Sequence, residues 1–127
     1  MKKVIVLLAL GLLAYACATV PVTGRKQLAM VSNSEIIPMA TEQYQQVLKE
    51  GKLATNREYN DMVKRVGVRI QKAVEQFMAE KSLSSELEGF KWEFNVIDDP
   101  NTVNAWCMPG GKVAFYTGIM PICKDES

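Results

Sequence analysis

The segment NAWCMPGGKVAFYTG, residues 104–118, decides how the second half of this 127-residue chain folds. Pro109 and the pair Gly110-Gly111 predict a sharp bend, because glycine adopts a positive φ at little cost. The run that follows, residues 112–117, is a predicted strand whose backbone can lie at the edge of a sheet. Exposed edges bind peptides as added strands in some proteins, whereas a plain hairpin corner has no such role. Composition alone favours the plain corner.

The residues just before this segment change from a helical period to a period of two. Trp92, Phe94 and Val96 alternate with polar residues, which predicts a strand over residues 91–97 that packs on one face. The sequence Asp-Asp-Pro-Asn at 98–101 is typical of a turn. We therefore expect a small antiparallel β hairpin or sheet in this half of the chain.

Two long amphipathic helices are expected in the first half, over residues 34–50 and 56–81. In each, apolar residues recur at three- and four-residue steps, while charged and amide side chains fill the other side. Asn56 is a candidate N-cap for the second helix. The apolar stripe of that helix fits core packing better than a coiled-coil seam. The expected fold class is α+β, with two helices followed by a small sheet.

The amino terminus carries the pattern of an export signal. Lys2 and Lys3 precede a short apolar run that ends in Leu-Ala-Tyr-Ala-Cys at residues 13–17. A basic start, an apolar core and small residues before a cleavage point predict a signal peptide over residues 1–17. The ending also resembles a bacterial lipobox, in which the thiol of Cys17 is acylated.

An ordinary cleaved signal with a stray Cys17, and an uncleaved anchor helix, are the alternatives to lipidation. Two or more acyl chains anchor a protein stably in a bilayer. Ala18 resembles the sorting pattern for the outer membrane, so we expect a lipid-anchored protein on the periplasmic face of that membrane in the bacterial cell envelope. Residues 18–33 contain Pro and Gly and lack a helical period, which predicts an extended tether to a body formed by residues 34–127.

Composition excludes several classes of function. The chain holds 15 Lys and Arg against 14 Asp and Glu, and without Lys2 and Lys3 the balance is 13 to 14, or −1. Such a balance predicts no basic surface for nucleic acid. The histidine count is zero, which removes Ser-His-Asp and Cys-His nucleophiles and any two-histidine metal site. Three cysteines are too few for a four-cysteine zinc site.

Several motifs together resemble a known family of enzymes. They are Asn-Ala-Trp at 104–106, Pro-Gly-Gly-Lys-Val at 109–113, Tyr-Thr-Gly-Ile at 116–119, Val-Gly-Val-Arg-Ile at 66–70, Trp-Glu-Phe at 92–94 and Pro-Val-Thr-Gly-Arg-Lys-Gln-Leu at 21–28. This combination is similar to the zinc metallopeptidases of the HtpX, CAAX-protease and Oma type, especially the Oma-like lipoproteins of Gram-negative bacteria. The resemblance covers nearly the whole chain after the leader.

The resemblance implies a gluzincin-like body in which an HExxH helix follows the Tyr-Thr-Gly-Ile segment. In the complete family member, two histidines and a later glutamate bind zinc, and the motif glutamate acts as general base on the metal-bound water. The HExxH motif is not in this sequence, so we expect no catalytic residue and no metal ligand in it. The expected function is the amino-terminal part of a zinc metalloendopeptidase, truncated before HExxH, that serves protein quality control in the bacterial envelope.

The same resemblance implies that Asn104, Ala105 and Trp106 contact a peptide or protein substrate, with the Asn104 side chain bonding substrate amide groups. The alternative is that Asn104 caps a turn and Trp106 fills the core. Cys107 and Cys123 either form a disulfide in an oxidising periplasm or remain free thiols, and their spacing leaves both open.

A non-catalytic envelope lipoprotein, acting as a peptide-binding or adaptor module, is the competing function. The DNA beyond codon 127 separates the two, because an HExxH helix encoded there supports the enzyme. A structural lipoprotein without peptide binding is a third possibility, and it predicts that Asn104→Ala changes stability alone.

Overall fold

A computed structural model describes residues 17–28 and 31–126, which fall into two compact units, 1–32 and 33–127. The predicted signal peptide lies outside the described residues, apart from the backbone of Cys17. Neither long helix in the described ranges is apolar enough to cross a membrane.

The first unit contains a short antiparallel hairpin. Strands β1 (Cys17–Thr19) and β2 (Lys26–Leu28) pair with Cys17 opposite Leu28. Gly24 allows the turn with a φ of 68°, and its N–H donates to the Val20 carbonyl at 2.9 Å. Part of the segment expected to be an extended tether therefore forms a hairpin, whose two strands are extended.

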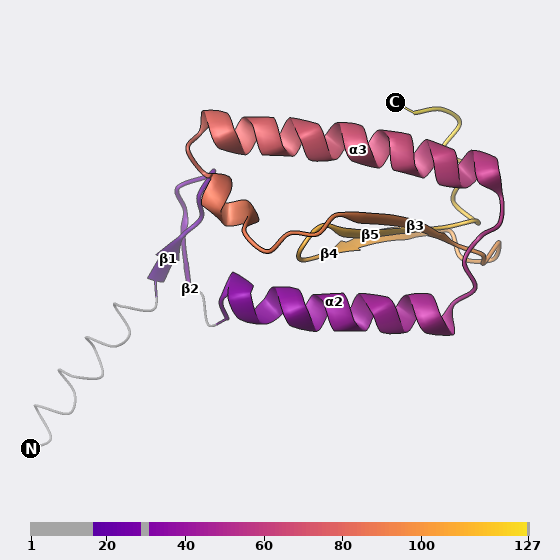
Figure 1. The fold of residues 1–127 in the computed structure, drawn as a ribbon, viewed down its shortest axis with the longest axis horizontal. Helices are drawn as coiled ribbons and strands as arrows, with labels where there is room; N and C mark the ends of the chain where they lie inside the picture. The colour runs from indigo at the N-terminus through magenta and orange to yellow at the C-terminus, as the bar shows by residue number, and fades with distance from the viewer. Residues whose placement is uncertain (1–16, 29–30, 127) are drawn as a thin grey trace, which may run out of the picture. The chain divides into compact units, whose positions relative to one another are not determined.

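The second unit has a three-stranded sheet between two helices (Figure 1). Its elements are α2 (Asn33–Glu50), α3 (Arg57–Glu80), the 3₁₀ helix η1 (Ser84–Leu87), β3 (Glu93–Ile97), β4 (Ala105–Met108) and β5 (Lys112–Tyr116). The predicted helices agree with α2 and α3 to within one residue at each end. Asn56 caps α3 as expected, because its side-chain oxygen accepts from the Tyr59 N–H at 3.1 Å. The α+β class is confirmed.

The sheet is mixed rather than wholly antiparallel. Its order is β3-β5-β4, with β4 antiparallel to β5 and β3 parallel to β5. Residues 98–104 carry the chain from β3 past the end of β5, and β5 then returns between the other two strands. The bend holds Gly110 at φ 84° and Gly111 at φ 78°, which confirms the predicted positive-φ turn.

Both faces of the sheet are covered by apolar packing, not one face as the pattern of β3 predicts. Toward α3 lies a core cluster of buried residues, namely Ala54, Val63, Val96 and Met120, with Phe94 and Phe115 packed against it. Toward α2 lies a second cluster of Tyr44, Ile97 and Ala114, with Trp106, Met108 and Tyr116 beside it. The two helices and the sheet thus form three layers.

Close approach at one glycine sets the path of the chain into β4. A Cβ placed on Gly118 would collide with the carbonyl oxygen of Thr102, and it would lie 2.8 Å from that of Pro100. The Gly118 N–H also donates to the Asp99 carbonyl at 3.1 Å. The absence of a side chain at Gly118 therefore allows residues 99–102 to pack against the end of β5.

Candidate functional site

Strand β4, which carries the Asn-Ala-Trp motif, forms one edge of the sheet. The Tyr116 N–H donates to the Asn104 carbonyl at 3.1 Å, and the register then pairs Trp106 with Ala114. In an antiparallel ladder the residues that bond to the partner strand alternate with residues whose peptide groups face away. The N–H and C=O groups of Ala105 and Cys107 therefore face away from β5, toward the open side of β4.

The two edges of the sheet differ. Beside β3, the Ala54 N–H donates to the Val96 carbonyl at 2.9 Å and the Asp98 N–H donates to the Lys52 carbonyl at 2.6 Å. The segment before α3 thus covers part of the β3 edge. Within the described ranges, β4 pairs with β5 alone.

The β4 edge also lacks the usual protection against pairing. Proteins blunt exposed edges with charged side chains or with proline inside the strand. Residues 102–111 contain no charged side chain before Lys112, and Pro109 follows the strand rather than interrupting it. An extended peptide therefore meets no electrostatic or proline barrier on β4 itself.

Asn104 is exposed and lies immediately before β4. Its side-chain oxygen Oδ1 accepts a hydrogen bond from the Ala105 N–H at 2.8 Å. That N–H is one of the outward-facing groups of the edge. The Asn104 side chain therefore sits directly on the donor that an added strand would use.

Trp106 faces the interior beneath the edge. Its ring meets the ring of Tyr44 edge-on, with centroids 5.7 Å apart and planes at 81°. Its indole N–H donates to the Tyr116 hydroxyl at 3.4 Å. The half-buried side chain thus supports β4 from the α2 side, and the structure brings it to the core cluster around Tyr44 rather than to the open side.

Tyr44 is fully buried and joins α2 to the sheet. Its hydroxyl donates to the Val113 carbonyl at 2.7 Å and accepts from the Asn95 side-chain amide at 3.0 Å. Burial raises the pKa of this phenol, the Asn95 hydrogen bond opposes the shift, and the charge of Glu93 adds to it. The sequence pattern identifies Tyr44 as an apolar-stripe residue but contains no signal for these polar contacts.

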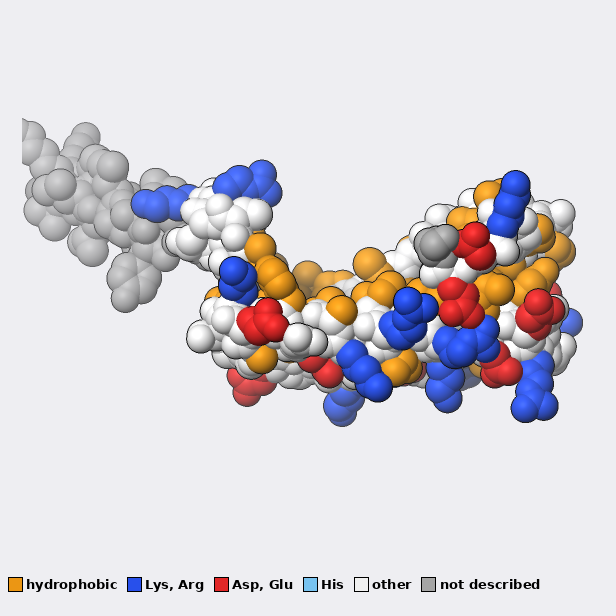
Figure 2. Space-filling model, turned by 90° about the horizontal axis from the view of Figure 1, so that it is seen from above, with side chains coloured by type: hydrophobic (Ala, Val, Ile, Leu, Met, Phe, Trp, Pro, Cys, Tyr) orange, Lys and Arg blue, Asp and Glu red, His pale blue; other side chains and the backbone are white. Residues whose placement is uncertain are grey.

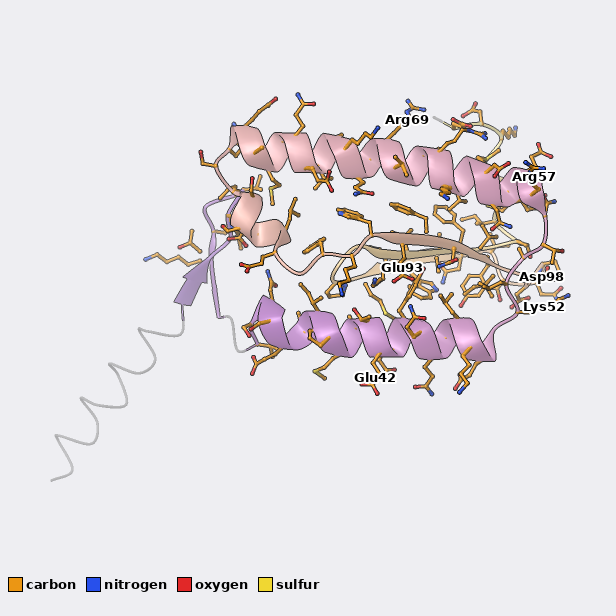
Figure 3. The ribbon with its side chains drawn as sticks, in the orientation of Figure 1. Glu42, Lys52, Arg57, Arg69, Glu93 and Asp98 are labelled. Atoms are coloured by element: carbon orange, nitrogen blue, oxygen red, sulfur yellow. The ribbon has the colours of Figure 1, made fainter. Side chains whose placement is uncertain are left out.

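Lys112, the first residue of β5, is almost completely buried at 1% exposure. Its ammonium group contacts Glu93 Oε1 and the Lys91 carbonyl, both at 2.5 Å. The other oxygen of Glu93 accepts from the Gln45 side chain of α2 at 3.2 Å. Figure 3 shows Glu93 on the part of the sheet that faces α2. A buried ammonium needs such partners, because an unpaired charge in the interior is costly.

An apolar groove of about 480 Å³ lies on the opposite face, between α3, the sheet and the carboxy-terminal segment. Its apolar lining includes Val66, Ile70, Trp92, Phe94, Val113, Ile122 and Cys123. Figure 2 shows apolar side chains gathered along one side of α3 and charged side chains along the rest of it. Cys123 is half-buried in this groove and Cys107 is exposed on β4, and both thiols are free in this structure.

Glu126 fixes the carboxy-terminal segment across α3. Its carboxylate contacts Arg65 at 2.5 Å and Arg69 at 3.6 Å. The hydrogen bond to Glu126 and the charge of that residue raise the pKa of the Arg65 guanidinium. The ion pairs of Glu126 with Arg65 and Arg69 therefore lie along one side of the groove.

The residues present do not fit a zinc centre. The sequence has no histidine, and in the part of the chain that the structure describes no three Cys, Asp or Glu residues are grouped to hold a metal ion. Catalytic zinc sites take three protein ligands, usually with histidine among them. No catalytic step is therefore assigned to these residues.

The sequence profile of peptidase family M48 matches residues 65–127. The chain belongs to this family, to its Oma type, and corresponds to an amino-terminal portion of such a protein.

The curated relatives include three that carry the same name. The mitochondrial metalloendopeptidase OMA1 of Schizosaccharomyces pombe is 32% identical over 107 residues, which are 84% of this chain and 29% of that protein. The Saccharomyces cerevisiae protein is 30% identical over 112 residues, 84% of this chain and 31% of that protein. The Arabidopsis thaliana protein is 36% identical over 58 residues, 46% of this chain and 12% of that protein.

The chain thus spans less than a third of the length of these relatives. No solved structure gives a significant match. Membership of the family confirms the resemblance and implies zinc in the full-length member.

Proposed function

We propose that this chain is the substrate-holding part of a zinc metalloendopeptidase, and that β4 binds peptide as an added strand. The open, uncharged edge of β4 is the observation that carries the proposal. The zinc ligands and the catalytic base would come from residues that are not in this sequence. The names of the relatives, all metalloendopeptidases, support the class of reaction.

The proposed contacts are mainly with the peptide backbone. Ala105 and Cys107 present outward N–H and C=O groups, which match the spacing of an extended strand. Asn104 flanks them at the start of the strand, and the half-buried ring of Trp106 holds the strand on α2. Recognition through main-chain groups suits a peptidase that acts on unfolded segments of many proteins.

We place the protein in the bacterial cell envelope, anchored through an acylated Cys17 to the periplasmic face of the outer membrane. The basic and apolar leader with its Leu-Ala-Tyr-Ala-Cys ending supports this location. The proposed role there is quality control by proteolysis of damaged envelope proteins. Its partners would be a protein substrate and the membrane surface.

Substitution at Cys107 tests the edge. Proline removes an N–H and is tolerated in an edge strand where that N–H faces outward. We expect Cys107→Pro to weaken binding of a fluorescein-labelled extended apolar peptide to the full chain by about tenfold, because a backbone donor is lost. The matched variant Cys107→Ser keeps the N–H and should bind like the unsubstituted chain. Equal affinity of all three chains would contradict the proposal.

A further inference from the structure

Strand β4 has two N–H groups that face away from β5, and they differ in their hydrogen bonding. The Ala105 N–H is held by Asn104 Oδ1 at 2.8 Å. The strand alternation turns the Cys107 N–H to the same side, and Cys107 is exposed. One of the two donors is therefore blocked by a neighbouring side chain.

The hydrogen bond from Asn104 lies on a strand edge that has no other protection against pairing with a further strand. A free strand edge pairs readily with other chains unless a charge, a proline or a covering segment interferes. Residues 104–108 carry no charge and no proline, and within the described ranges no further strand covers them. The Asn104 side chain is the polar group that interrupts this edge.

We propose that Asn104 is a removable cap on β4. In the free chain its side-chain oxygen occupies the Ala105 N–H, and an incoming peptide strand displaces it and takes over that donor. The displacement needs only rotation of an exposed side chain, whose oxygen then bonds to water. The step breaks one exposed hydrogen bond, so the cap lowers peptide affinity slightly while it discourages pairing with other edges. The second half of this proposal rests on the proposed function of β4.

Amide hydrogen exchange tests the cap without any peptide. We expect the Ala105 amide of the full chain to exchange several-fold more slowly than the Cys107 amide, after correction for their intrinsic rates. Asn104→Ala should raise the Ala105 rate to that of Cys107. Asn104→Asp keeps an acceptor oxygen and should preserve the protection. An Ala105 rate that does not change in Asn104→Ala would overturn the proposal.

Peptide affinity tests the displacement. With the fluorescein-labelled apolar peptide, Asn104→Ala should bind about two- to tenfold more tightly than the unsubstituted chain, the ratio that corresponds to one net hydrogen bond. Asn101→Ala, which removes an exposed asparagine from the preceding loop, is the matched control and should leave affinity unchanged. Weaker binding by Asn104→Ala would overturn the cap and show that Asn104 holds the peptide directly. Absence of binding to the unsubstituted chain would overturn both the displacement step and the peptide-binding function, while hydrogen exchange would still decide whether the cap exists.

Discussion

The ring of Trp106 stands edge-on against the ring of Tyr44, so the open edge strand rests on the centre of α2. The same tyrosine donates to the Val113 carbonyl of β5 and accepts from Asn95 of β3. One side chain of α2 therefore contacts all three strands. The position of β4 depends on a residue that is distant from it in sequence.

Tyr44→Phe is expected to destabilise the fold by about 1–3 kcal/mol, because it leaves the half-buried side-chain amide of Asn95 without its acceptor and the Val113 carbonyl without its donor. The phenylalanine ring keeps the edge contact with Trp106, so the loss reports the hydroxyl alone. Urea unfolding followed by tryptophan fluorescence measures it. Trp106→Phe is a useful comparison, since it alters the ring contact and leaves the Tyr44 hydroxyl bonded. An unfolding free energy that Tyr44→Phe leaves unchanged would refute this account of the hydroxyl.

Alkaline pH should weaken the contribution of Tyr44. Burial raises its pKa in the folded state above the ordinary value of 10.0, so the unfolded chain loses the phenolic proton first. The contribution is fully present below about pH 10 and is lost as pH rises through the folded-state pKa. The difference in unfolding free energy between the unsubstituted chain and Tyr44→Phe should therefore shrink above pH 10. A difference that stays constant or grows would show that the phenol ionises as easily in the folded chain.

Lys112→Met should cost about 1–3 kcal/mol of stability, because Glu93 and the Lys91 carbonyl lose their buried donor. Glu93 is 35% exposed on its side chain, so water can replace part of the lost contact. Glu93→Gln added to Lys112→Met should recover part of the loss. The four unfolding free energies of this double-mutant cycle give the coupling directly. Additive effects would mean that the pair contributes nothing as a pair.

The helices are predictable from sequence because their information is local. The apolar periods of residues 34–50 and 56–81 predict the positions of α2 and α3. Asn56 predicts the start of α3, and its side chain forms the N-cap hydrogen bond there. The bend at Gly110 and Gly111 is likewise local, since glycine alone explains both positive φ angles.

Features that depend on distant partners are not predictable in this way. Strand β4 has only four residues between a loop and a bend, and it exists because β5 pairs with it. The parallel pairing of β3 with β5 depends on residues 98–104, which carry the chain past the end of β5 and leave room for that strand in the middle of the sheet. The sequence does not predict the burial of Lys112, because its partner Glu93 lies nineteen positions earlier in the chain.

Cys17→Ser should abolish incorporation of labelled fatty acid when the chain is expressed in a bacterium with two membranes. Acylation uses the thiol of that cysteine, which serine lacks. Cys107→Ser is the matched control and should leave labelling unchanged. Gel autoradiography of the immunoprecipitated chain measures the label. If the Cys17→Ser chain is labelled as strongly as the unsubstituted chain, the proposed acylation of Cys17 is wrong.

Gly118→Ala and Gly67→Ala separate the edge strand from the rest of the fold. A Cβ at Gly118 collides with the Thr102 carbonyl and pushes on the loop that leads into β4, whereas a Cβ at Gly67 collides with the ring of Phe94 beneath α3. Each change should lower the unfolding free energy, by about 1–3 kcal/mol for Gly118→Ala, because the added methyl overpacks a filled site. For Gly67→Ala, helix propensity offsets up to about 1 kcal/mol of the loss.

Only Gly118→Ala should also weaken peptide binding, because it displaces the segment that sets the position of Asn104 and Ala105. The measurement is peptide affinity at a temperature where circular dichroism shows both variants to be fully folded. Since Phe94 lies on β3, at the far edge of the sheet, Gly67→Ala should leave that affinity unchanged. If both variants bind equally well, the peptide site does not depend on the path of residues 99–104. If both lose binding equally, the loss reflects the whole fold rather than the edge.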